Sequence, residues 1–232
     1  MRYLNDSKPE KYLQLLVVLV GVFLIAPFFS SGVGNVLNGL LLLSTIIAVI
    51  KSLNLPRSIV AIYTAIACMA YGLDLVSSMG WTPELNRELA LLTQALFALY
   101  LGGAAFWIGR DIAGSREVTS DTVRGGISVY LLIGFVWSLF YGIAETLDAN
   151  AFSQRLITDS TSFLKALHFS FTTLTTLGYG DIVPVSDLAL VLTNLEAIAG
   201  QMYSTIFIAI LVGSYLSRQN REEMRALRDR DS

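Results

Sequence analysis

Charged residues are scarce in this chain of 232 residues. Asp, Glu, Lys and Arg make up 15% of it, whereas hydrophobic residues make up 54%. Soluble domains carry about 25% charged residues, so this composition indicates a membrane protein. The net charge of −2 at neutral pH identifies no partner, and nothing in the sequence supports nucleic-acid binding.

Cysteine and histidine are scarcer still. Cys68 is the only cysteine and lies in an apolar stretch, which excludes an intrachain disulfide framework and a CxxC metal site. His168 is the only histidine. The sequence shows no His or Cys cluster, no nucleophile with a base and no phosphate loop. We therefore do not expect an enzyme.

Long apolar stretches, in contrast, are plentiful. A spanning helix needs about 20 apolar residues. Six stretches are candidates: Tyr12–Phe29, Val36–Ile50, Ser58–Ser77, Glu88–Gly109, Ile127–Leu147 and Asp187–Leu216. A seventh helical stretch, Thr161–Thr175, would cover about 22 Å at 1.5 Å per residue. Because it cannot cross about 30 Å of hydrocarbon, we expect it to be re-entrant.

Lys and Arg lie almost entirely on one side of these spans. With the N-terminus inside, the inner side holds 13 of the 16, and the outer side holds only Arg87, Arg155 and Lys165. The positive-inside rule then places both termini in the cytoplasm. We expect a multi-pass protein of the plasma (cell inner) membrane.

The segment TTLTTLGYGDIVP (172–184) places threonines and glycines at membrane depth. Irregular backbone survives there only when it is buried in protein or lines a water-filled path. Gly178 and Gly180 can adopt positive φ without a Cβ penalty, which lets successive carbonyls point to one side. Four such strands around an axis would form cages of carbonyl oxygens that replace the hydration shell of a cation. Because the motif occurs once in the chain, we expect a homotetramer with closed symmetry.

This segment resembles the signature of the potassium-channel superfamily, TxTTxGYGD, and the resemblance extends from Ile127 to Leu216. It implies an outer helix, a pore helix, an extended selectivity filter and an inner helix. It also implies that K+ is coordinated by the Thr176 hydroxyl and by the carbonyls of Thr176, Leu177, Gly178 and Tyr179. The expected fold class is therefore an all-α membrane protein with six transmembrane helices plus a re-entrant pore helix and the extended filter.

Several polar side chains could support the filter. His168, Thr172 and Thr175 share one face of the pore helix. The resemblance implies that the residue at His168 can bond the aspartate after the filter, Asp181. That contact would make the filter pH-sensitive, and simple packing behind the pore is the alternative. Glu196, a carboxylate well inside a span, is hypothesised to hold the back of the filter through the Thr172 face; a structural bond within the bundle is the equal alternative.

The last span carries the candidate gate. Gly200 lies 20 residues after Gly180, where the resemblance places a hinge glycine; a packing glycine is the equal alternative. One face of the same helix is expected to line the cavity, with Gln201, Ser204, Thr205 and Ile208.

The first four spans lack the charges of a voltage sensor. Such sensors carry Arg or Lys at every third position of the fourth helix, whereas here no positive charge lies between Arg87 and Arg110. We therefore divide the chain into a four-helix domain without gating charges (1–110), a cytoplasmic interfacial linker (111–126), a pore domain (127–216) and a charged cytoplasmic tail (217–232).

The predicted function is a voltage-independent, homotetrameric channel selective for K+. A weakly selective cation channel and a non-conducting membrane scaffold or accessory subunit are the alternatives. Membrane lipids are the expected partners, with anionic lipid a candidate for the five arginines of the tail.

Overall fold

The structure, a computed structural model, describes residues 11–25, 45, 48–49, 57–77, 83–114, 118–156 and 162–230. Across these ranges the fold is all-α, as predicted. The named helices are α1 (Lys11–Ile25), α3 (Arg57–Ser77), α4 (Pro83–Ala113), α5 (Ser120–Leu147), α6 (Ser162–Leu174) and α7 (Asp187–Arg230). The β pairing within the same ranges is one isolated antiparallel bridge between Phe152 and Pro184.

Three helices in the described part of the chain are long and apolar enough to cross a membrane. They are Glu84–Ala113, Ser120–Leu147 and Asp187–Ser214. Lys11–Leu24 and Val60–Leu73 form shorter apolar helices. Most of the predicted second span, Val36–Ile50, and the end of the first, 26–29, lie outside the described residues.

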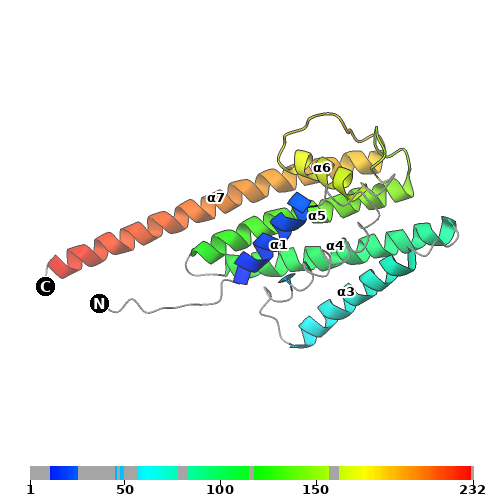
Figure 1. The fold of residues 1–232 in the computed structure, drawn as a ribbon. Helices are drawn as coiled ribbons and strands as arrows, with labels where there is room; N and C mark the ends of the chain where they lie inside the picture. Colours follow the sequence, from blue (N-terminus) through cyan, green and yellow to red (C-terminus); the bar gives the residue numbers. More distant parts are fainter. Residues whose placement is uncertain are drawn as a thin grey trace.

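The helices pack around α4 and α5, which lie side by side (Figure 1). α3 packs on α4, α1 packs on α5, and α6 and α7 pack on α5 and on each other. Residues from α1, α4 and α5 form one buried core, in which Leu15, Tyr100, Ile108 and Leu132 are almost inaccessible to solvent. This core joins the N-terminal helices to the half of the chain that carries TLGYGD (176–181), the glycine motif.

The connection between α4 and α5 differs from the predicted interfacial linker. α4 continues to Ala113, and α5 begins at Ser120 rather than at Ile127. Thr119 and Thr122 fix this start, because the hydroxyl of each accepts a hydrogen bond from the backbone N–H of the other. The prediction placed this helix start too late because charged residues are rare inside a membrane span, so only the apolar residues from Ile127 onward were assigned to it.

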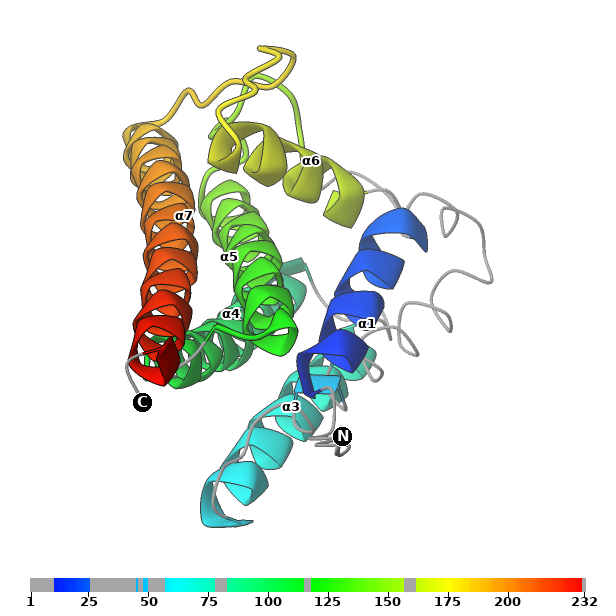
Figure 2. The ribbon, with the colours of Figure 1, turned by 90° about the vertical axis from the view of Figure 1, so that its left-hand side faces the viewer.

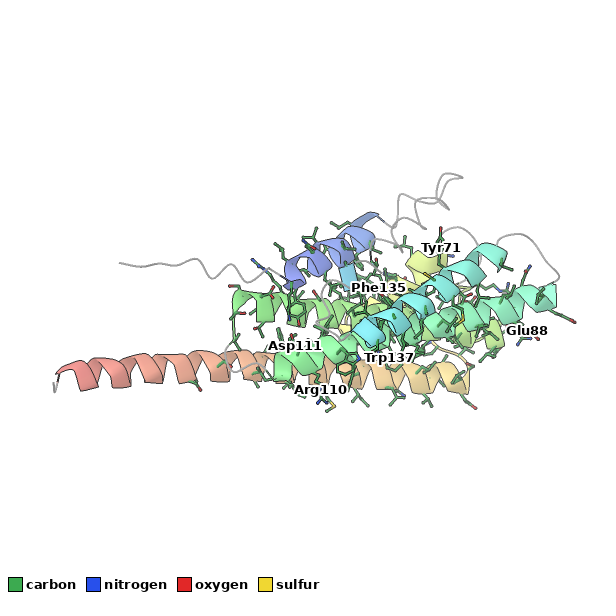
Figure 3. All side chains as sticks on the ribbon, turned by 90° about the horizontal axis from the view of Figure 1, so that it is seen from below. Tyr71, Glu88, Arg110, Asp111, Phe135 and Trp137 are labelled. Atoms are coloured by element: carbon green, nitrogen blue, oxygen red, sulfur yellow. The ribbon has the colours of Figure 1, made fainter. Side chains whose placement is uncertain are left out.

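α4 carries its charged residues near its ends. Figure 3 shows Glu88 toward one end of the helix and Arg110 and Asp111 toward the other, and the sequence between Glu88 and Arg110 holds no charge. At the Glu88 end, the Arg87 guanidinium donates to the carbonyl oxygens of Thr146 and Leu147, both at 3.1 Å. A cation suits these unpaired carbonyls, so Arg87 caps α5.

α7 is the longest helix in the described ranges, with 44 residues or about 66 Å. It runs antiparallel to α5 and extends well beyond the other helices (Figure 1). The charged tail, 217–232, continues this helix as far as Arg230.

Candidate functional site

The short helix α6 leads directly into the glycine motif. Its 13 residues, Ser162–Leu174, agree within one residue at each end with the predicted Thr161–Thr175. At about 20 Å it is too short to span a membrane. Figure 2 shows α6 across one end of α5 and beside α7. The carbonyl end of α6, which carries partial negative charge, therefore meets the first residues of the motif.

The backbone after α6 alternates between two conformations. Thr176, Gly178 and Gly180 have φ of 59°, 53° and 78°, and the residues between them do not have positive φ. Two of the three are the glycines expected to adopt it. Thr176 was not expected there, because a β-branched residue with positive φ is strained. A strand with positive φ at alternate residues can direct successive carbonyls to one side.

Main-chain hydrogen bonds fasten the motif to α6. The N–H of Gly178 donates to the Thr172 carbonyl at 3.0 Å, and the N–H of Thr176 donates to Thr173 at 2.9 Å. From α7, Gln201 Nε2 donates to the Thr176 hydroxyl at 3.3 Å. The position of α6 therefore determines the position of the motif, and α7 contacts its first residue directly.

His168 and Asp181 meet at the far end of the motif. His168 Nε2 lies 3.1 Å from Asp181 Oδ2, and its ring stacks on Tyr179 with centroids 5.9 Å apart. Desolvation raises the pKa of Asp181, but hydrogen bonds from His168 and from the backbone N–H groups of Ile182 and Asp181 outweigh it. The pKa of Asp181 therefore lies below its ordinary value. The pH-sensitivity of this contact stays a prediction.

Residues 148–156, which follow α5, brace the same end. Gln154 Nε2 donates to the Asp181 carbonyl at 2.8 Å, and the N–H of Ser153 donates to the Val183 carbonyl at 2.9 Å. The buried Glu145, near the end of α5, accepts from the Leu156 N–H at 2.8 and 3.0 Å. Sequence reasoning missed Glu145, because a carboxylate close to a helix end is ordinarily solvated.

Glu196 lies behind α6 and is fully buried. The Tyr141 hydroxyl of α5 donates to its Oε2, and the Ser170 hydroxyl of α6 lies 2.6 Å from its Oε1. The prediction that Glu196 acts through Thr172 is wrong, because Glu196 contacts Ser170 instead. The Thr172 hydroxyl donates to the Phe169 carbonyl at 2.9 Å. The Thr175 hydroxyl likewise bonds its own helix, at Phe171.

Gly200 packs against the end of α6. A methyl group on Gly200 would overlap the Leu174 carbonyl oxygen and come within 2.9 Å of its Cδ1. α7 continues through Gly200 as one helix. This contact agrees with the packing alternative, and a hinge at Gly200 stays a prediction.

The expected cavity face of α7 is largely uncovered. Gln201, Thr205 and Ile208 are exposed, and Ser204 is half-buried. In the motif itself, the apolar side chain of Leu177 is 56% exposed and that of Tyr179 is 68% exposed. Further large apolar side chains are exposed along α7, among them Val191, Leu195, Ile198, Met202 and Ile206.

Comparison with known families agrees with this geometry. Residues 126–216 match a family model described as "Ion channel". The matched segment contains most of α5, all of α6, the glycine motif and α7 as far as Leu216. It is therefore an ion-channel domain, and the resemblance to the potassium-channel superfamily is confirmed for it. An ion-channel family is not an enzyme family, which fits the expectation that the chain is no enzyme. No curated protein and no solved structure matches the chain.

Proposed function

We propose that this protein is a potassium-selective channel that conducts K+ passively across the plasma membrane. The alternating φ values of Thr176, Gly178 and Gly180 carry the proposal, because a backbone of this form can present a row of carbonyl oxygens to a dehydrated cation. The Thr176 hydroxyl and the carbonyls of Thr176, Leu177, Gly178 and Tyr179 would coordinate K+, the transported ion.

A homotetramer would complete this site. One chain supplies one filter strand, and four strands around an axis form a closed cage. The exposed apolar side chains of Leu177 and of α7 support this assembly, since large uncovered apolar surfaces mark contacts with protein or lipid. The cavity would be lined by Gln201, Ser204, Thr205 and Ile208, with Gly200 beside the gate.

The proposed topology has six spans, a re-entrant α6 and both termini in the cytoplasm. The excess of Lys and Arg on the N- and C-terminal side supports this orientation. The arginines of the tail then face the inner leaflet, where anionic lipid attracts basic segments.

Gating would not use a charged fourth helix. Moving one charge through 100 mV gains about 2.3 kcal/mol, so steep voltage dependence needs several charges in each subunit. The stretch of α4 between Glu88 and Arg110 carries none.

Reversal potentials of the purified protein in planar bilayers test the proposal. With K+ on one side and Na+ on the other, a K+-selective pore gives a reversal potential close to that of K+. A weakly selective cation channel gives a value near zero, and a scaffold gives no current. Stepped voltages on the same bilayers should leave the open probability almost unchanged.

A further inference from the structure

Two close oxygen contacts meet at Glu196 between α5, α6 and α7, and a third joins its partner Ser170 back to α5. The Tyr141 hydroxyl bonds Oε2 of Glu196. The Ser170 oxygen lies 2.6 Å from Oε1 of Glu196 and 2.8 Å from the carbonyl oxygen of Gly134. Both Ser170 distances are typical of full O–H···O hydrogen bonds. Each of the three contacts therefore needs a hydrogen between its two oxygens.

The hydroxyls supply only two of these hydrogens. Tyr141 and Ser170 each carry one, and the Gly134 carbonyl can only accept. An ionised Glu196 could also only accept. One of the two Ser170 contacts would then bring two oxygen atoms together with no hydrogen between them. The third hydrogen must therefore be carried by the carboxyl group of Glu196. In the arrangement that satisfies every contact, Tyr141 donates to Glu196, Glu196 donates to Ser170, and Ser170 donates to Gly134.

Within the described ranges, no cation is hydrogen-bonded or ion-paired to Glu196. The titratable neighbour on α5 is Tyr141, with Tyr130 farther along the helix, and the contacting group on α6 is the neutral Ser170. α7 itself carries no Lys or Arg between Asp187 and Ser217. Burying an unpaired carboxylate costs far more than burying a hydrogen-bonded neutral acid.

We infer that Glu196 is a protonated, neutral carboxylic acid at neutral pH and acts as the positioning residue that holds α6 behind the filter. The inference deepens the proposed function and rests on it. Ser170 lies two residues before Thr172, whose carbonyl accepts the Gly178 N–H of the filter at 3.0 Å. The proton on Glu196 thus fixes α6 between α5 and α7, and α6 in turn fixes the filter backbone.

An infrared spectrum of the purified channel tests the protonation state directly. A protonated carboxylic acid has a C=O stretch that a carboxylate lacks. We expect the wild-type spectrum at pH 7 to contain such a band that is absent from Glu196→Gln. If subtracting the two spectra reveals no such band, Glu196 is ionised and the inference is overturned. This readout needs no ion flux, so it stands even if the proposed channel function fails.

Ion flux through variants of Glu196 tests its positioning role. Glutamine can donate to Ser170 and accept from Tyr141, so Glu196→Gln should keep K+ flux within about twofold and keep K+ over Na+ selectivity. Its flux should also tolerate alkaline pH better than the wild type, whose carboxyl can lose the proton. Glu196→Leu, which provides neither bond, should lose selectivity. An equal loss of flux and selectivity in Glu196→Gln and Glu196→Leu would contradict the positioning role.

Substitutions of two buried serines form a matched pair that leaves the carboxyl group of Glu196 unaltered. Ser170→Ala removes the acceptor of the Glu196 proton and should raise relative Na+ permeability about tenfold. Ser138→Ala is the control, because the buried Ser138 hydroxyl donates to the Phe135 carbonyl of its own helix at 2.7 Å. The inference predicts selectivity close to wild type for Ser138→Ala, and an equal loss in both variants would overturn it.

Discussion

Gly200 of α7 lies directly against the main-chain carbonyl of Leu174, the last residue of α6. Four residues earlier on each helix, Glu196 meets Ser170. Residues four apart lie one above the other on a helix face, so the two contacts are successive steps of one interface. α7 therefore holds α6 at its end, where the glycine motif begins.

Gly200→Ala should disrupt this interface. The added methyl group overlaps the Leu174 carbonyl, and the strain of such overpacking is typically about 1–3 kcal/mol. We expect a lower melting temperature and reduced K+ flux. Gly213→Ala is the control, because Gly213 lies in the same helix with nothing within 4 Å of the new methyl group. Alanine there should stabilise the helix by up to about 1 kcal/mol. Identical behaviour of the two variants would contradict the packing role of Gly200.

Acid should weaken the outer end of the filter through Asp181. Its pKa is lowered in the folded protein, so the carboxylate stabilises the structure above its ordinary pKa, and this stabilisation disappears as pH falls through the lowered value. K+ flux measured against external pH should therefore persist below the ordinary aspartate pKa of about 3.9.

His168→Phe tests the cause of that shift. Without the hydrogen bond from His168, the pKa of Asp181 rises toward its ordinary value, and the acid loss of flux should move to higher pH. Asp181→Asn should remove this acid step altogether. An unchanged midpoint in His168→Phe would show that the contact does not control the filter.

Gln201 should set selectivity through the Thr176 hydroxyl. Gln201→Leu removes the donor at 3.3 Å and frees the hydroxyl to rotate. A neutral hydrogen bond is worth about 1 kcal/mol, so relative Na+ permeability should rise about fivefold. In a Thr176→Val background the same substitution should have no further effect. Additive effects in the double variant would mean that Gln201 acts elsewhere.

Glu145 should stabilise the loop that braces the filter exit. Glu145→Ala leaves the buried Leu156 N–H without its acceptor, which costs about 1–3 kcal/mol. We expect a lower melting temperature and faster proteolysis at residues 151–156. The exposed Glu88 on α4 offers a control, because Glu88→Ala should change neither. Equal stability of the two variants would argue against the brace.

Local signals explain which parts could be predicted from the sequence. The lengths of the apolar stretches predicted where α3, α5, α6 and the start of α7 lie, because the thickness of a membrane limits the length of a helix that can span it. The glycines of the motif predicted the positive φ of Gly178 and Gly180, because only glycine adopts it without strain. Both signals lie within a few consecutive residues.

Contacts between distant residues could not be predicted in the same way. The sequence marked Glu196 as unusual but could not select Ser170 over Thr172, since both lie on α6 and only helix rotation distinguishes them. Thr176 adopts positive φ against its own preference, held by the hydrogen bond that its N–H donates to Thr173 of α6 and by the one that it accepts from Gln201. The start of α5 was missed because a reciprocal threonine cap begins the helix at Ser120, before the apolar stretch on which the prediction relied.

Potassium selectivity is tested most directly by the reversal potential of purified protein in planar bilayers with a K+ gradient and Na+ as the opposing cation. We expect unitary currents that reverse near the K+ equilibrium potential, with an open probability almost independent of voltage. Currents that reverse near zero, or silent bilayers containing intact tetramers, would contradict it.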